Sequence, residues 1–281
     1  MKKILSIVFL IQLSVYSQPS SIDLHTPANI KKFADHLFCE GDYLRTIEQY
    51  QLLSNQFVND TIEFKLILSY SNLGLYNESN EVFGKINTES KIYSDGYLLS
   101  IKNQLLLKPE VLRITHHPLL TEKQSVSFNR LTTISTLYSH QPVFSEKKFV
   151  DVFDKSDEET VTFLYKSKFD PPYKSSALAG IMSAVVPGSG KAYVGEWSDG
   201  ITGFLLTGLF AFLAYDNFKA NHDARAWIFT GIGAFFYAGN IYGSISSAQI
   251  FNARIDFEFQ NGLKLFLENN NYFLPEYDFC K

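Results

Sequence analysis

Charged residues nearly disappear from two long stretches in the second half of this chain. The stretches run from Ile201 to Phe218 and from Ala226 to Ile250, and a short polar loop separates them. A helix needs about 20 predominantly apolar residues to cross the ~30 Å hydrocarbon core of a bilayer. The pattern therefore predicts a helical hairpin in a membrane, with spans at 200–218 and 226–248.

A shorter apolar run precedes this hairpin. Residues 177–186 carry no charge, but about ten residues cannot cross a bilayer. We interpret the run either as a re-entrant half-helix or as a helix lying at the membrane interface. The next four residues, Pro187-Gly188-Ser189-Gly190, predict a tight turn. We therefore assign residues 177–251 to a membrane domain.

Asn240 is a polar residue inside the second apolar stretch. Its amide needs a hydrogen-bond partner there, and we expect that partner across the helix pair. Gly239 and Gly243 form a small-xxx-small pattern that lets helices approach closely. Trp197 and Trp227 lie near the ends of the stretches, where amphipathic rings favour the membrane interface.

Between residues 27 and 90 the sequence repeats with a period of 33 residues. Each unit reads as a helix, a glycine turn, an aromatic residue and a second helix with an apolar stripe. This pattern resembles the tetratricopeptide repeat, although Ile67 is bulkier than the family pattern allows, so the second unit is degenerate. Another kind of antiparallel helical hairpin is the alternative, and it too would expose an apolar face that only a neighbour can cover. The signature residues are Ala34, Gly41, Tyr43, Tyr50, Tyr70, Gly74, Tyr76 and Phe83.

The chain from 93 to 165 continues in this style with less regularity, and we interpret it as cryptic or capping repeats. Its apolar spacing predicts helices at 92–107, 126–138, 147–153 and 159–165. Together with the regular units these helices make a helical-repeat domain over 18–165. A linker at 166–176, which contains Pro171-Pro172, joins it to the membrane domain.

Apolar and polar residues alternate in the tail at 252–281. The alternation covers 255–259 and 263–267, and Asn261-Gly262 lies between them. Period-two alternation on both sides of an Asn-Gly pair predicts a short β-hairpin. The expected fold class is therefore mainly α, with tetratricopeptide-like hairpins, a transmembrane helical hairpin and this small β element.

The first 17 residues have the features of a secretory signal peptide. Lys2 and Lys3 precede an apolar run over 4–15, and Val15-Tyr16-Ser17 places small residues at the two positions that a signal peptidase reads. Cleavage after Ser17 would export the helical repeats. An uncleaved membrane anchor is the alternative.

Charge and cysteine content narrow the function classes. The net charge is −4, and no basic cluster interleaves with aromatic residues, so we expect no nucleic-acid partner. Two distant cysteines, Cys39 and Cys280, do not make a disulfide framework. We expect Cys39 to behave as a small buried apolar side chain.

The chain offers no recognisable catalytic or cofactor site. Gly190-Lys191 invites a phosphate-loop interpretation, but that motif needs glycine where Val185 stands and serine or threonine where Ala192 stands. His116-His117 has no further ligand at metal-binding spacing. We therefore expect no nucleotide, no cofactor and no metal, and a protein that is not an enzyme.

The block from Lys174 to Asn252 is similar to a family of small two-span hairpin domains in bacterial, particularly Bacteroidetes-like, envelope proteins. These domains begin Pro-Gly-x-Gly-x-x-Tyr-x-Gly and often follow a signal peptide and repeats. The resemblance implies an architecture and a cellular address, and leaves the biochemical role open. Its carrying residues here are Pro187, Gly188, Gly190, Tyr193, Gly195, Asp199, Gly200, Tyr237, Gly239, Asn240, Tyr242 and Gly243.

These patterns lead to one functional hypothesis and one alternative. The hypothesis is a non-enzymatic envelope protein, anchored in the bacterial inner membrane, whose helical repeats lie in the periplasm with the tail and bind a protein partner. The alternative places the function in the hairpin itself, as a module for membrane-protein assembly, lipid interaction or transport. In both, the lipid bilayer is a partner.

Overall fold

The computed structural model describes residues 25–53, 57, 59–107, 120–269 and 279–280. Within these residues all regular secondary structure is helical, so the prediction of a mainly α protein is confirmed. The chain divides into two compact units, residues 1–138 with 270–281 (unit 1) and residues 139–269 (unit 2). The predicted signal peptide at 1–17 and His116-His117 lie outside the described residues.

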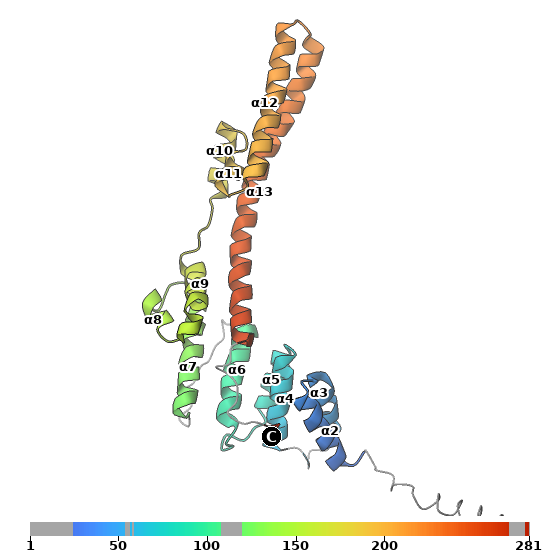
Figure 1. The fold of residues 1–281 in the computed structure, drawn as a ribbon, viewed down its shortest axis with the longest axis vertical. Coiled ribbons are helices and arrows are strands. Elements are labelled where there is room, and N and C mark those ends of the chain that lie inside the picture. The colour runs from blue at the N-terminus through green and yellow to red at the C-terminus, as the bar shows by residue number, and fades with distance from the viewer. Residues whose placement is uncertain (1–24, 54–56, 58, 108–119, 270–278, 281) are drawn as a thin grey trace, which may run out of the picture. The chain divides into compact units, whose positions relative to one another are not determined.

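Unit 1 begins with two antiparallel helix pairs (Figure 1). Gly41 and Gly74 lie in the turns inside the pairs and have left-handed φ angles of 77° and 75°, a conformation that glycine adopts without steric cost. The helix pairs lie where the 33-residue period placed them. They are α2 (Pro27–Cys39), α3 (Tyr43–Gln51), α4 (Asp60–Asn72) and α5 (Tyr76–Phe83).

Large apolar side chains join these pairs into a core. Ala34, Tyr50 and Ile62 form one buried cluster between the first pair and α4. Phe64 and Leu99 belong to a second cluster that connects α4 with α6 (Tyr93–Leu107). Each pair thus buries apolar side chains against the following helix, as helical repeats do.

Unit 1 continues with α7 (Glu122–Ser135) and the 3-10 turn η3 (Thr136–Tyr138). The helix starts four residues before the predicted 126 because Thr121 and Gln124 form a reciprocal capping box. The Tyr138 hydroxyl donates to the carbonyl oxygen of Leu105 at 2.8 Å. Burial raises the pKa of Tyr138 to about 12.

A disulfide joins Cys39 to Cys280. The expectation that Cys39 is a buried apolar side chain is therefore wrong. Cys39 is the last residue of α2 and is exposed, as is Cys280. Sequence spacing gave no sign of the pair because the two residues are 241 positions apart.

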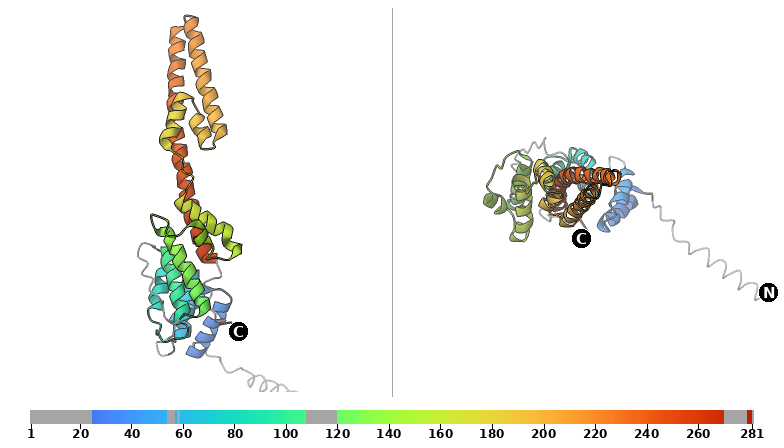
Figure 2. Two further views of the ribbon diagram at one scale, coloured as in Figure 1. Left: turned by 90° about the vertical axis from the view of Figure 1, so that its left-hand side faces the viewer. Right: turned by 90° about the horizontal axis from the view of Figure 1, so that it is seen from above.

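Unit 2 consists of short helices packed around one long hairpin. Figure 2 shows α12 and α13 side by side, with α13 continuing well past the level at which α12 begins. Residues 220–222 connect them, and Asn221 adopts a left-handed φ of 61° in that connection. The elements are α8 (Glu146–Val150), the 3-10 turn η4 (Lys155–Asp157), α9 (Glu158–Phe169), α10 (Ser176–Val185), α11 (Ser189–Tyr193), α12 (Trp197–Lys219) and α13 (Asp223–Asn269).

The predicted β-hairpin at 255–267 is wrong, because this segment continues α13 as a helix. Ile255, Leu263 and Leu267 are spaced by eight and four residues, which places them on one helical face, and all three are buried. Helix α9 packs on this part of α13, and its Leu164 is fully buried. These apolar positions fit both the two-residue period of a strand and the 3.6-residue period of a helix. The helix forms because these residues pack against α9.

The prediction of two membrane spans also needs correction. Among the described helices, only α12 is long and apolar enough to cross a membrane. The second predicted span, 226–248, lies inside the 47-residue α13. Asn240, Ser244 and Ser247 interrupt its apolar character, and the helix runs on into a charged segment. The finding is one apolar helix packed on a longer, more polar one.

Candidate functional site in the α12–α13 hairpin

The Pro-Gly turn brings two backbones into close contact. Gly188 has a φ of 84°, and a Cβ atom added there would lie 2.0 Å from the carbonyl oxygen of Gly200. A Cβ at Gly200 would in turn lie 2.6 Å from the carbonyl oxygen of Gly188. The turn before α11 thus rests directly on the first turn of α12, and both positions require glycine.

Small residues also join α10, α11 and α13. The Gly190 amide donates to Ser183 Oγ at 3.0 Å, and Ser183 Oγ lies 2.7 Å from Ser244 Oγ. A Cβ at Gly190 would lie 1.9 Å from the carbonyl oxygen of Ala179. The fully buried hydroxyl groups of Ser183 and Ser244 thus each have a hydrogen-bond partner.

Asn240 connects α13 to α12, as its place in an apolar stretch predicted. Its side-chain amide donates to the carbonyl oxygen of Gly203 at 3.1 Å and to Thr207 Oγ1 at 3.0 Å. A Cβ at Gly203 would lie only 2.1 Å from Asn240 Oδ1. The missing side chain at Gly203 therefore makes room for the amide, which is buried.

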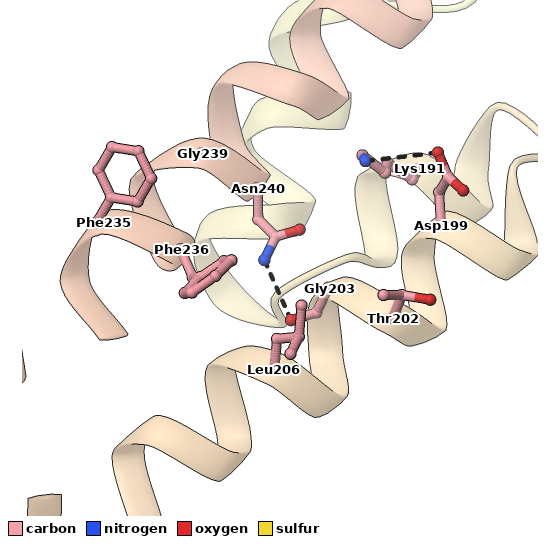
Figure 3. A pocket seen from close by; sticks show the side chains of 9 residues that line it. All are labelled: Lys191, Asp199, Thr202, Gly203, Leu206, Phe235, Phe236, Gly239 and Asn240. Carbon is pink, nitrogen blue, oxygen red and sulfur yellow. Dashed lines mark hydrogen bonds and ion pairs between the residues drawn. The ribbon is translucent and has the colours of Figure 1, made fainter. Parts of the chain in front are cut away.

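An open pocket of about 340 Å³ lies beside this contact. In Figure 3, Lys191 and Asp199 face each other on one side, and Phe235 and Phe236 lie on the other. Lys191 Nζ lies 3.8 Å from Asp199 Oδ2. The pocket therefore combines an apolar wall with one ion pair. Its lining residues are Lys191, Asp199, Thr202, Gly203, Leu206, Phe235, Phe236, Gly239 and Asn240.

The tyrosines of the predicted motif have separate roles. The Tyr193 hydroxyl accepts from the Ser175 amide at 3.3 Å, and Lys174 Nζ lies 4.8 Å from the centre of its ring. The Tyr237 hydroxyl donates to the carbonyl oxygen of Ala184 at 2.7 Å. These two tyrosines fasten α10 at both ends. Tyr242 is exposed and makes no such connection.

The remaining motif glycines differ in what surrounds them. Gly195 has a left-handed φ of 94° and open space around it, and Gly239 also faces open space. A Cβ at Gly243 would lie 3.2 Å from Lys191 Cε. Pro187 opens the turn and is half-buried. Of these three glycines, Gly243 is therefore the one at which an added side chain would meet the pocket residue Lys191.

Sequence reasoning missed several polar contacts of α13. Ser247 Oγ donates to Glu196 Oε2 at 2.6 Å. The Asn252 side chain bonds both to the Lys174 amide (2.8 Å) and to the Lys174 carbonyl oxygen (2.9 Å). Ser244 and Ser247 are also polar residues inside the apolar stretch, which is the feature that identified Asn240. Their partners come from distant segments, so the sequence could not supply them.

The repeat-signature residues of unit 1 are placed around its helix crossings. Ala34, Tyr50 and Tyr76 are buried. The Tyr70 hydroxyl accepts from the exposed Gln51 side chain at 3.0 Å. Tyr43 contacts the Phe38 ring. Phe83 contacts Tyr93 and approaches Gly96. With Gly41 and Gly74 in the turns, these residues support packing, and none of them forms part of a chemical site.

A charged cluster lies beside this packing. Asp35 accepts from Tyr50 at 2.5 Å and from Lys65 at 2.6 Å, and Lys31 Nζ lies 2.7 Å away. Partial burial alone would raise the pKa of the Asp35 carboxyl, but the hydrogen bonds from Lys31, Lys65 and Tyr50 outweigh it and lower the pKa below its usual range. Burial and the Asp35 carboxylate raise the pKa of Tyr50. The Lys65 side chain, only 6% exposed, is thereby neutralised by Asp35.

The described residues contain no group of three His, Cys, Asp or Glu side chains placed to hold a metal ion. Comparison with models of known protein families, with curated proteins and with solved structures found no match.

Proposed function

We propose that this chain is a non-enzymatic protein of the bacterial cell envelope, embedded in the inner membrane through the α12–α13 hairpin. In this proposal unit 1 is a tetratricopeptide-like domain that lies in the periplasm and binds a protein partner.

One observation carries the membrane part. In α12 the three buried residues are small, namely Gly200, Gly203 and Ala214. In the first half of α13 the buried residues are also small or polar, as Asn240 and Ser244 illustrate. A soluble helix of this length buries large apolar side chains and exposes polar ones. The large exposed side chains here are Trp197, Ile201, Phe204, Leu205, Leu209, Phe212, Tyr215, Phe218, Trp227, Ile228, Ile232, Phe235, Tyr237 and Tyr242.

The lower part of α13 supports this contrast within the same helix. There the buried residues are Ile255, Leu263, Phe266 and Leu267, which is an ordinary apolar core. The packing thus changes from small and polar inside to large and apolar inside between Ala248 and Ile255. Apolar side chains that face outward stabilise a helix in lipid and destabilise it in water.

The disulfide supports the topology. Cys39 precedes α12 and Cys280 follows α13, and a bond between them requires both residues on the same side of any membrane. In this proposal α13, which by itself is not apolar enough to count as a span, returns the chain to its starting side while packed on α12. Because disulfides persist in the periplasm and are rare in the cytosol, we place unit 1 in the periplasm.

Charged substitutions on the outward face of α12 test the membrane part. Leu205 and Leu209 are exposed and one helical turn apart. Each lysine at the middle of a span costs about 2.5–3.5 kcal/mol, so Leu205→Lys with Leu209→Lys should move the full chain from the carbonate-resistant membrane fraction into the soluble fraction. Val143→Lys, which changes an equally exposed apolar residue outside the hairpin, is the control. Unchanged membrane retention of the double variant would contradict the proposal.

Exposed apolar side chains on the first helix pair support the partner part. Phe33, Leu44 and Leu52 are each at least 47% exposed and lie outside the two core clusters. We expect the full chain to retain a protein from envelope extract that a Leu44→Asp, Leu52→Asp variant does not retain. Equal retention by both forms would show that this surface is not used.

The pocket beside Asn240 favours a second candidate, a lipid-binding module. An ammonium group at the edge of an apolar wall suits a lipid with an anionic headgroup. Native mass spectrometry of the detergent-purified full chain should show anionic phospholipid bound to the wild type and lost in Lys191→Gln. Lys264→Gln changes an exposed lysine of α13 and should leave binding unchanged. Equal lipid retention in all three proteins would exclude this candidate.

A further inference from the structure

Phe279 follows α13 in the chain but belongs to unit 1, where it packs on α2 and α4. Its ring centre lies 5.8 Å from that of Phe64 and 6.3 Å from that of Phe38. Lys65 Nζ lies 5.5 Å from the Phe279 ring centre and 5.4 Å from that of Phe38. Phe279 thus occupies an aromatic site on α2 and α4, which we define as Phe38, Phe64 and Lys65.

This contact differs from the rest of the core. The other members of the Phe64 cluster come from α4, α5, α6 and the turn between the last two, whereas Phe279 is at least 180 residues away from each of them in the sequence. Its neighbour Cys280 holds it there through the exposed disulfide to Cys39. The ammonium group of Lys65 faces the ring and adds a cation–π attraction. Phe279 therefore occupies the aromatic site as an intramolecular ligand that the disulfide holds in place.

We infer that the aromatic site binds an aromatic side chain from an extended segment of a partner protein, and that Phe279 blocks it in the disulfide-bonded protein. This inference rests on the proposed partner-binding role of unit 1. While the disulfide is intact, the tether gives Phe279 a high effective concentration at the site. A partner must then compete with an intramolecular ligand, which weakens its apparent binding.

Reduction would release this block. A dithiol reductant attacks one sulfur of the Cys39–Cys280 bond through its thiolate and forms a mixed disulfide, which its second thiol resolves. Two electrons and two protons pass to the protein, so that two cysteine thiols form and the reductant becomes a disulfide. Both cysteines are exposed, so a dithiol can reach the bond. Phe279 is then no longer tethered to α2 through Cys280 and exchanges with other ligands.

A peptide of this chain's own sequence tests the inference. The probe is a fluorescent peptide of residues 274–281 with Cys280→Ser, and binding is followed by anisotropy with the full chain in detergent. We expect it to bind a Phe279→Ala, Cys280→Ser protein at least tenfold more tightly than the disulfide-bonded wild type. Wild type treated with dithiothreitol should fall between the two. Equal binding to the double variant and to the disulfide-bonded wild type, or none to either, would overturn the inference.

Two controls locate the binding. A peptide that also carries Phe279→Ala should bind at least tenfold more weakly, and this control leaves the folding of the protein untouched. In the double-variant background, Phe38→Ala should weaken binding, whereas Phe33→Ala on the same helix should not. Equal binding of the two peptides would contradict the aromatic site. Failure of the peptide test would leave the proposed partner surface at Leu44 and Leu52 standing, because the extract experiment tests that surface separately.

Discussion

At the scale of the residue, glycines set how closely the segments of unit 2 approach. A Cβ at Gly190 would overlap the Ala179 carbonyl oxygen, and one at Gly188 would overlap that of Gly200. Neither obstacle can rotate away, because both are backbone atoms. Gly208 on α12 shows the opposite case, with nothing within 4 Å of its added Cβ.

Gly190→Ala should therefore destabilise unit 2, by about 2 kcal/mol or more, because an overpacked contact forces the backbone to shift. Gly208→Ala should be neutral or stabilising by up to ~1 kcal/mol, since alanine favours helices over glycine. Thermal unfolding in detergent, followed by the fluorescence of Trp197 and Trp227, measures this difference within unit 2. Equal melting temperatures for the two variants would contradict the close packing of α10 and α11.

Asp35 has a comparable role in unit 1, because it neutralises the buried Lys65. Asp35→Ala would leave that ammonium buried without a partner, which costs about 3 kcal/mol. Amide hydrogen exchange in α4 should then accelerate by about a hundredfold where exchange needs unfolding of the unit. Asp42→Asn, which removes the charge from an exposed pair with Arg45, should change α4 exchange little. An Asp35→Ala protein with wild-type exchange rates would show that the ion pair is not stabilising.

The same carboxyl gives a pH dependence with a defined sign. Hydrogen bonds hold the pKa of Asp35 below its usual range in the folded protein, so its contribution is fully present above the unfolded pKa of about 3.9. The contribution is lost as the pH falls through the folded pKa. Protection of α4 should therefore drop below about pH 4 in the wild type and much less in Asp35→Ala, when both are corrected for intrinsic exchange.

At the scale of the element, the sequence predicted most helices and failed where two periods fit the same residues. Glycine turns 33 residues apart placed α2 to α5, and the loss of charge placed α12. In contrast, Ile255, Leu263 and Leu267 fit both a strand and a helix, and Asn261-Gly262 is a strong turn signal. The helix forms because its apolar face packs on α9, a contact that sequence alone does not contain.

The pairing of α12 with α13 was predictable in outline, whereas the prediction of two membrane spans was wrong. Low charge reveals an apolar segment, and Asn240 indicated a polar contact across the pair. Its partners at Gly203 and Thr207 depend on the register of two helices, which sequence spacing does not determine. The disulfide between Cys39 and Cys280 was missed because nothing in the spacing of two distant cysteines marks them as neighbours.

Gly262→Ala distinguishes the helix from the predicted turn. The added Cβ would lie 3.5 Å from Phe163 Cε1 and 3.6 Å from Leu164 Cδ2, which is ordinary van der Waals contact. The variant should stabilise α13 by about 0.5–1 kcal/mol and slow amide exchange over 255–267. If residue 262 instead lay in a hairpin turn that needs a left-handed φ, Gly262→Ala would destabilise this segment and accelerate its amide exchange.

At the scale of the whole molecule, each unit has its own kind of interior. Unit 1 buries large apolar residues such as Phe64 and Ile67, together with the neutralised pair of Asp35 and Lys65. Around α12, unit 2 buries glycine, serine and asparagine and exposes its large side chains. The disulfide adds that the chain before α12 and the chain after α13 share one compartment. Together these features are the basis of our proposal that unit 1 lies in the periplasm and that α12 lies in lipid.

The measurement that tests this account most directly is quenching of tryptophan fluorescence by lipids brominated in their acyl chains. The two tryptophans, Trp197 and Trp227, are replaced by phenylalanine, and Phe212→Trp places one reporter on the exposed apolar face of α12. The full chain is reconstituted into vesicles, and Val143→Trp in the same background serves as the reporter outside the hairpin. The account predicts strong quenching of the reporter at 212 by bromine deep in the bilayer and little quenching at 143. Equal emission from the reporter at 212 with and without bromine would show that α12 does not enter the membrane.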